Sequence, residues 1–218
     1  MIDQNYISFF EELEKNNHKE WFDEHRKDYE NHVRKPFIEL IEALIPALLE
    51  IEPDLHTDAK KTLFRINRDI RFSKDKTPYN SLMKASLSSE GKKSEVPGFY
   101  IGIGAEKVHV GGGLYQLSKD RLSQVRDLIV SNKQEFISII NDPEFKSSFG
   151  ELQGERNKRL DKKYADLESE LPYIANKQFY AMAKFNTSSF VKDNNQVEAL
   201  MKYFRVIQPL HAFLNRAF

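Results

Sequence analysis

Apolar residues recur at helical spacing through residues 1–52, and this pattern predicts a helical N-terminal part. The apolar positions of its first helix are Tyr6, Ile7, Phe9, Phe10 and Leu13. Asn17 is predicted to cap the next helix, with Glu20 as its capping-box partner. We expect Pro36 to end or kink that second helix, because proline lacks an N–H donor and clashes with the preceding turn.

Over residues 60–116 the period of the pattern changes to two, which is typical of strands. The predicted strands cover residues 62–72, 82–88, 99–105 and 108–110. Only Glu106 and Lys107 separate the last two strands, so we expect these strands to form a hairpin. Short connections between successive strands favour an antiparallel sheet.

The last part, residues 117–218, is predicted to be mainly helical with one late strand. Ser118 is a suitable N-cap for the first of these helices, the late strand covers residues 177–185, and residues 197–218 form the last helix. The whole chain is therefore predicted to be a single α+β domain, an antiparallel β-sheet packed by N-terminal, middle and C-terminal helices.

Composition excludes several classes of protein. The chain has 218 residues, 40% of them hydrophobic, which is too many for a disordered chain. It has no cysteine, so disulfide scaffolds, thiolate metal sites and cysteine nucleophiles are excluded. No apolar run approaches the ~20 residues that a membrane helix needs, and the N-terminus has no signal-peptide pattern. We expect a cytoplasmic globular protein with no membrane partner.

Positive charge is concentrated in one segment of a chain whose 33 basic and 33 acidic residues balance. Residues 60–76 contain seven basic and two acidic side chains, a local charge of +5, which leaves 26 basic and 31 acidic residues, or −5, elsewhere. The basic residues are Lys60, Lys61, Arg65, Arg68, Arg71, Lys74 and Lys76.

Strand alternation would place the side chains of this segment on two faces. The face expected to meet the core holds Phe64, Ile66, Ile70 and Phe72. The polar face holds Leu63, Arg65, Asn67, Asp69 and Arg71. Arg68 falls on the apolar face, so it needs a carboxylate partner, a route to solvent or a bulge, because burying an unpaired charge is costly.

Two interpretations of the basic segment remain open. In one, the arginines form ion pairs with Asp69 and Asp75 and serve structure alone. In the other, which the excess positive charge favours, the cations converge on an anion, because the planar guanidinium group matches phosphate or carboxylate. The anion-binding residues would be Arg65, Arg68, Arg71, Lys74 and Lys76, with Asp69 and Asp75 orienting the guanidinium groups.

Further residues are predicted to line this pocket. They are Tyr79, Gly112, Gly113 and Tyr115. Gly111, Gly112 and Gly113 are expected to end a strand, where they either form a turn or offer backbone N–H groups to a phosphate. His109 is the best candidate for proton transfer, because neutral imidazole is available near pH 7, and a strand histidine that faces solvent is the alternative.

Metal and cofactor patterns fail. His18, His25 and His32 are seven residues apart, about 10.5 Å along a helix, which is too far for two of them to bind one ion. Gly91-Lys92 is followed by lysine where a phosphate-binding loop needs serine or threonine, and no dinucleotide-binding glycine pattern is present. We therefore predict no metal and no cofactor.

The segment RINRDIRFSKDKTPYN, residues 65–80, resembles the signature of the domain of unknown function 2461 family. Residues 16–36, the glycine segment Gly111 to Tyr115, and the closing segment 209–215 are also similar to that family. The resemblance implies a compact α+β domain found mainly in bacteria, and it implies no activity. The chain departs from the family at Gln116-Leu117 and at residues 161–168, so a pocket that the latter loop completes would be altered here.

Three functions follow from these patterns. The first is binding of, or action on, a phosphorylated small molecule or nucleotide. The second is a nucleic-acid-binding module, in which the basic loop at residues 156–163 adds to the positive surface. The third is a structural or protein-interaction domain with internal Arg–Asp networks. The sequence decides neither the reaction, nor whether there is one, nor the oligomeric state.

Overall fold

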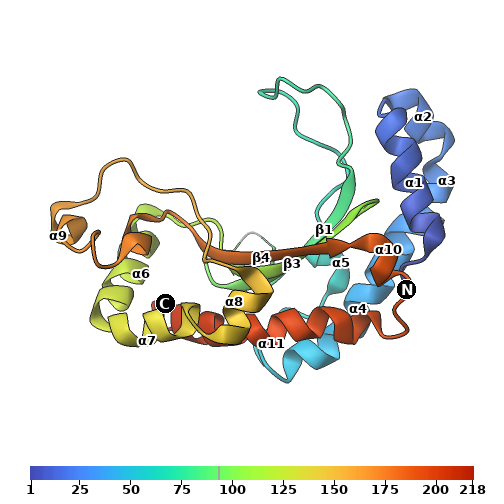
Figure 1. Ribbon diagram of the computed structural model, residues 1–218. Helices are drawn as coiled ribbons and strands as arrows, with labels where there is room; N and C mark the ends of the chain where they lie inside the picture. The colour runs from blue at the N-terminus through green and yellow to red at the C-terminus, as the bar shows by residue number, and fades with distance from the viewer. Residues whose placement is uncertain (93) are drawn as a thin grey trace.

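A four-stranded antiparallel sheet in the order β1-β2-β3-β4 lies at the centre of the computed structural model, which describes residues 1–92 and 94–218 (Figure 1). The strands are β1 (Leu82–Leu87), β2 (Gly98–Gly104), β3 (Lys107–Leu114) and β4 (Phe179–Asn186). The predicted strands at 82–88, 99–105 and 177–185 are thus confirmed to within two residues, and the predicted strand at 108–110 is longer at both ends. The predicted α+β class is confirmed.

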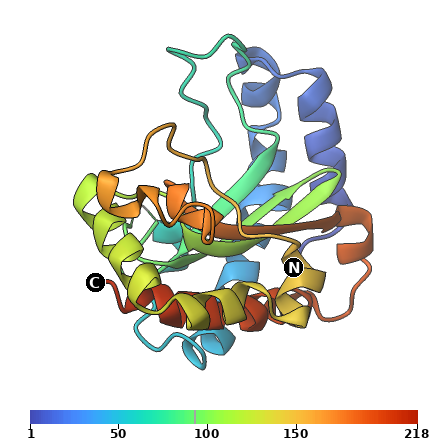
Figure 2. The ribbon, with the colours of Figure 1, turned by 60° about the vertical axis from the view of Figure 1, so that its left-hand side comes forward.

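Helices from three parts of the chain surround this sheet (Figure 2). The N-terminal ones are α1 (Gln4–Lys15), α2 (Lys19–Glu24), α3 (Arg26–Asp28), the π-helix η1 (Tyr29–Arg34), α4 (Lys35–Leu49) and α5 (Ala59–Thr62). The middle ones are α6 (Lys119–Ser131), α7 (Lys133–Ile140), α8 (Pro143–Phe149), α9 (Lys162–Ala165) and the 3₁₀-helix η2 (Pro172–Ala175). The C-terminal ones are α10 (Thr187–Phe190) and α11 (Gln196–Asn215). No described helix combines the length and the apolar character needed to cross a membrane.

One face of the sheet carries the core. Helix α11 packs across β3, with α4 beside it, and Figure 1 shows α7, α8 and α11 on the same side. The strand residues that face these helices are almost fully buried: Met83, Ala85, Leu87, Phe99, Ile101, Ile103, Val108, Val110 and Ala181. Burying one large side chain of this kind stabilises the fold by roughly 1.5–3 kcal/mol. Residues 64–80 and the segment around α9 rise on the opposite side (Figure 1).

The basic segment does not form the predicted strand at residues 62–72. Helix α5 ends at Thr62, and only isolated bridges follow, from Leu63 to Ala85 and from Asn67 to Tyr79. The side-chain alternation therefore fails at both ends, because Leu63 is 8% exposed and Phe72 is 96% exposed. Ile66 is buried as predicted. Without a continuous neighbouring strand, nothing holds the later apolar residues of the segment against the sheet.

Two predictions in the N-terminal helices are corrected. The N-cap of α2 is His18, whose side chain accepts the Trp21 N–H, and Asn17 bonds elsewhere. Pro36 does not end the helical path, because it lies in the first turn of α4, directly after the π-helix. In a first turn the missing N–H of proline costs little.

A buried histidine fits against a glycine where α11 crosses the sheet. The His211 side chain is 1% exposed, its ring centroid lies 4.6 Å from that of Phe99, and its Nε2 has no hydrogen-bond partner. A Cβ atom on Gly112 would lie 2.7 Å from this Nε2, so β3 needs glycine here. Burial lowers the pKa of His211 to about 3, because the imidazolium ion cannot be solvated in the core.

Substitutions at Phe72 and Ile66 test the corrected positions of these side chains. Phe72→Ser is expected to change the free energy of unfolding by less than about 0.5 kcal/mol, because the ring is exposed. Ile66→Ala is expected to lower it by about 3 kcal/mol, because it leaves a cavity in the core. Urea denaturation followed by circular dichroism measures both. A larger loss for Phe72→Ser than for Ile66→Ala would contradict the fold described here.

The buried imidazole predicts an acid-sensitive fold. The pKa of His211 is lowered on folding, so the unfolded chain binds a proton below about pH 6.5 that the folded chain does not bind until about pH 3. Between these values this group alone removes about 1.4 kcal/mol of stability per pH unit as the pH falls. We expect His211→Leu to reduce the slope of the unfolding free energy against pH by about 1.4 kcal/mol per pH unit, the amount that one proton contributes. An unchanged slope would refute the burial of the His211 side chain.

Candidate functional site

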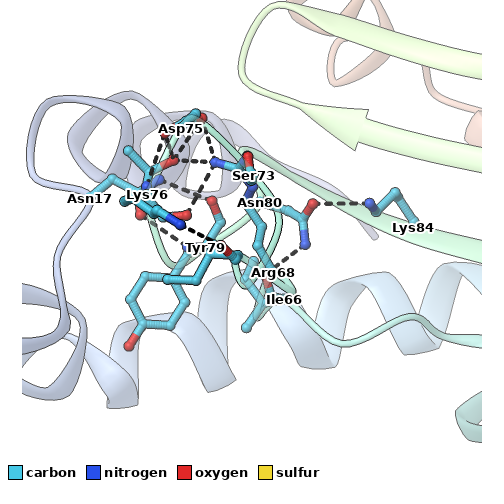
Figure 3. Close-up of polar contacts among 11 residues, drawn as sticks. Asn17, Ile66, Arg68, Ser73, Asp75, Lys76, Tyr79, Asn80 and Lys84 are labelled. Carbon is cyan, nitrogen blue, oxygen red and sulfur yellow. Dashed lines mark hydrogen bonds and ion pairs between the residues drawn. The ribbon is translucent and has the colours of Figure 1, made fainter.

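The loop at residues 66–80 is held together by its own arginine (Figure 3). Arg68 Nη1 donates to the Asp75 Oδ2 at 2.5 Å, to the Thr77 carbonyl oxygen at 3.1 Å and to the Thr77 hydroxyl. Its side chain is 25% exposed. A hydrogen bond from the Thr77 N–H, and then the Arg68 guanidinium group, lower the pKa of Asp75 to about 2. Of the three arrangements expected for Arg68, the structure thus shows the carboxylate partner.

The amide of Asn17 holds the end of this loop. Its Nδ2 donates to the Tyr79 carbonyl oxygen at 3.0 Å, and its Oδ1 accepts the Tyr79 N–H at 3.1 Å (Figure 3). The Tyr79 ring is buried and stacks on Phe22 at 4.0 Å between centroids. Tyr79, which was predicted to line a pocket, therefore anchors the loop to the N-terminal helices instead.

The other cations of the loop point in different directions. Arg71 forms a two-pronged ion pair with Asp69, at 2.9 Å and 2.6 Å, and both side chains are exposed. Lys76 donates to the Ile70 carbonyl oxygen at 2.9 Å. Arg71, Lys74 and Lys76 line none of three hollows that lie over the sheet and beside the base of this loop. The five cations predicted to converge therefore do not gather around one cavity in the part of the chain described.

A hollow of about 500 Å³ lies over the face of the sheet that α11 does not cover. One row of registered positions crosses its floor, from Lys84 through Gly102 and His109 to Lys184. Strands lie about 4.8 Å apart, so the row spans about 14 Å between the Cα atoms of Lys84 and Lys184. His109, Gly112, Gly113 and Tyr115, all predicted as site residues, line this hollow.

Three glycines run through β3 beside the hollow rather than ending the strand as predicted. A Cβ on Gly111 would lie 2.0 Å from the Ala181 carbonyl oxygen, and one on Gly113, whose φ is 124°, would lie 2.2 Å from the Phe179 carbonyl oxygen. The β3 backbone therefore approaches β4 too closely for side chains at these positions. At these positions of β3 the floor of the hollow therefore has no side chains, between the side chains of β2 and those of β4.

Tyrosines form one wall of the hollow. The Tyr115 ring is 62% exposed and meets the Tyr180 ring edge to face at 5.4 Å between centroids. Tyr100 leans along β2, so that its hydroxyl lies 3.0 Å from the position of a Cβ on Gly102. Burial raises the pKa of Tyr100 to about 12. This wall offers planar faces and hydroxyl donors to a ligand.

The charge of the hollow is uniformly positive among its described residues. Lys84, Lys92 and Lys184 line it together with His109, and no aspartate or glutamate does. Burial, and then the neighbouring charge of Arg68, lower the pKa of Lys84, while its Nζ donates to the Asn80 Oδ1 at 3.0 Å. Burial, and then Lys184, lower the pKa of His109. Both shifts disfavour the charged forms of Lys84 and His109, chiefly because the two side chains are partly buried.

Sequence reasoning missed the three lysines of the hollow. Lys84 and Lys184 stand at alternating positions of strands that were predicted correctly, so their side of the sheet was readable from the pattern. Lys92 was considered only as part of a failed phosphate-loop motif, and its Nζ donates to the Leu63 carbonyl oxygen at 2.7 Å. Lys84 and Lys184 line one hollow because β1 and β4 belong to the same sheet, with β2 and β3 between them. No short motif encodes this strand order.

Two further features of the described chain bear on the site. No group of three or more His, Cys, Asp or Glu side chains close enough to bind a metal is found among the described residues. In the basic loop at residues 156–163, Arg156 forms an ion pair with Glu168 at 2.7 Å and Lys163 with Asp127 at 2.9 Å. These two bases already have acidic partners.

Comparison with known proteins places the chain within a family. The family model described as "Conserved hypothetical protein (DUF2461)" matches residues 5–213. No curated protein matched the sequence in a search. The match covers the whole sheet, the loop that Arg68 holds and the hollow.

The contacts of Asp75 predict how it titrates. Its pKa of about 2 depends first on the Thr77 N–H and then on Arg68, so Arg68→Gln is expected to raise this pKa toward its ordinary value of 3.8 without reaching it. Carbon-detected NMR of the carboxyl group measures both values. Arg71→Gln is the matched control, because Arg71 pairs with Asp69, and it is expected to leave Asp75 unchanged. An Asp75 pKa that is ordinary in the unsubstituted protein would contradict the loop structure.

Proposed function

Since the chain belongs to the DUF2461 family of conserved hypothetical proteins, whose description names no activity, we propose its function from the hollow over the open sheet face. The proposed function is binding of a small anionic ligand that carries a phosphate group, such as a phosphorylated small molecule or a nucleotide. One observation carries this proposal: Lys84, Lys92 and Lys184 line the same hollow as His109, and the described lining of this hollow has no carboxylate.

The size and position of the hollow support a ligand of this size. Small-molecule sites have volumes of about 300–1,000 Å³, and this hollow measures about 500 Å³. Lysine supplies a point charge to a phosphate group, and Lys84 on β1 and Lys184 on β4 line the hollow from the two edge strands of the sheet. A protein of zero net charge gains nothing in stability from gathering like charges in this way, which favours a ligand as the reason.

The tyrosine wall suggests the remainder of the ligand. An aromatic ring that is 62% exposed, as Tyr115 is, offers one face for stacking, and its edge contact with Tyr180 holds the ring in place. A nucleobase or another planar group stacked there would extend the ligand from the lysines across β3. We therefore favour a nucleotide over a simple phosphate ester.

We assign proton transfer to His109 for any ligand that reacts. Its lowered pKa keeps the imidazole neutral at pH 7, in the form that accepts a proton. Arg65 keeps its predicted anion-binding role, because it lines the adjoining hollows. We assign Arg68 and Asp75 to the structure of the loop. The predicted cytoplasmic location, where phosphorylated metabolites and nucleotides occur, is consistent with such a ligand.

Sulfate binding tests the proposed site, because sulfate stays doubly charged across the pH range in which His109 titrates. An anion beside His109 stabilises the imidazolium ion, so binding raises its pKa and takes up a proton. We expect sulfate affinity to rise between about pH 8 and about pH 5.5, and His109→Gln to remove most of this rise. NMR titration of the His109 ring measures the pKa with and without sulfate.

Substitutions of the lysines complete this test. Lys84→Gln and Lys184→Gln are each expected to weaken sulfate and adenosine 5′-monophosphate binding about tenfold. Lys202→Gln is the matched control, because Lys202 is exposed on α11, which covers the other face of the sheet, and it should change neither affinity. Equal affinities in all three variants, measured by calorimetry, would place the ligand elsewhere.

A further inference from the structure

Two more basic hollows adjoin the one over the sheet. The first is lined by Arg65, Arg68, Lys84 and Lys92, and the second by Arg26, Arg34, Lys60, Arg65 and Lys92. Phe64 and Lys92 line all three hollows, so the three are neighbours around these two side chains. We call the three hollows together the basic track. It runs from β4 across the sheet to the N-terminal helices, past the base of the loop at residues 66–80.

The basic track is far more positive than the chain as a whole. Eight lysine and arginine side chains line it against two carboxylates, whereas the whole chain has equal numbers. The two carboxylates are Glu30 and Asp69. The balance of the chain requires the rest of its surface to be acidic. An anionic partner that touches the basic track would therefore be repelled elsewhere, which selects one mode of binding.

Several cations of the basic track have no acidic partner. Three of its cations do have one: Arg26 pairs with Asp23, Arg34 with Glu30 and Arg68 with Asp75. Among the described residues, the hydrogen bonds of Lys84 and Lys92 go to neutral oxygen atoms, so no carboxylate is paired with either side chain. Among the described residues, no ion pair forms at Lys60, Arg65 or Lys184 within 4.0 Å. Five uncompensated charges are thus spread along the basic track, more than one phosphate group can meet.

Two aromatic side chains lie along the basic track, near these cations. Phe64 is half-buried at the junction of the three hollows, and Tyr115 is exposed at the end near β4. Spaced cations with interleaved aromatic rings are the arrangement that binds single-stranded nucleic acid, because phosphates follow the charges and unstacked bases stack on the rings. Duplex DNA keeps its bases stacked inside the helix and cannot use such rings.

We infer that the basic track binds a single strand of nucleic acid several nucleotides long, with one nucleotide in the hollow over the sheet. This inference rests on the proposed function of that hollow, which supplies the terminal subsite. It adds the path of the strand, past Phe64 toward Lys60, and it makes the ligand a polymer rather than a mononucleotide.

Fluorescence anisotropy with a labelled oligothymidylate of about twelve nucleotides tests the inference, with thymidine 5′-monophosphate as the comparison. We expect the oligonucleotide to bind at least about tenfold more tightly than the monophosphate. Between about 50 mM and about 200 mM salt, the logarithm of its affinity should fall with a slope of about −3.5 against log salt, as five phosphate contacts require, and the monophosphate should show a slope nearer −1.

Variants locate the strand on the protein. Lys60→Gln and Arg65→Gln are expected to weaken oligonucleotide binding about fivefold each, while monophosphate affinity stays unchanged for Lys60→Gln. Lys61→Gln is the matched control, because this neighbouring lysine pairs with Asp58 and lines none of the hollows. Phe64→Leu keeps an apolar side chain but removes the ring, and it should weaken the oligonucleotide about tenfold. Thermal unfolding of each variant confirms that it is folded.

Each outcome decides a separate point. Monophosphate binding without tighter oligonucleotide binding would overturn the inferred binding of a nucleic-acid strand and leave the proposed function standing. If neither the monophosphate nor the oligonucleotide binds, both the inferred strand binding and the proposed function are overturned. Oligonucleotide binding that Lys60→Gln weakens and Lys184→Gln does not would keep the track and overturn the subsite over the sheet. Equal affinity for duplex DNA, or binding to phosphatidylserine vesicles in place of the oligonucleotide, would overturn the stacking of bases on Phe64.

Discussion

The packing of α11 across β3 determines which face of the sheet is buried in the core. Gly112 leaves the room that the His211 ring occupies, and the helix therefore lies close against the middle of the sheet. Once that face is buried, strand alternation sends the intervening side chains to the other face, where Lys84, His109 and Lys184 form a row. The glycines of β3 have no side chains that would project from the middle of this second face. This packing thus separates the buried, apolar face of the sheet from the face that carries the hollow.

Arginines of one short segment divide between two tasks. Arg68 lies inside the loop, where Asp75 and the Thr77 oxygen atoms take up its donors, and its charge is used for the structure of the loop. Arg65, three residues earlier, lies outside these contacts and contributes its charge to the surface. The acidic residues of the segment decide the division, because a carboxylate within reach neutralises one guanidinium group and leaves the next one free. The structural interpretation of the basic segment therefore applies to Arg68, and the proposed anion binding rests on Arg65.

The sequence predicted the elements better than their contacts. Strands at residues 82–88, 99–105 and 177–185 followed from a strict period of two, since alternation is set by the backbone and by one buried face. The same alternation failed at Phe72, because a pattern cannot show whether a neighbouring strand exists to bury it. The lysines on β1 and β4 are 100 residues apart in the chain, and only the complete pairing of the sheet brings them to one hollow. His109 and Tyr115 were found because their chemistry stands out locally, whereas lysine on a strand does not.

The Asn17 amide has a consequence for how the loop at residues 66–80 can stand away from the sheet. One side chain supplies both hydrogen bonds that a neighbouring strand would otherwise give to Tyr79. The end of the loop is therefore fastened by a residue outside both the loop and the sheet, and the contacts of Arg68 are closed within the loop itself. The loop therefore does not depend on further strands to keep its ends together. It can project from the sheet, with Phe72 in solvent, while the strands beneath it keep their register.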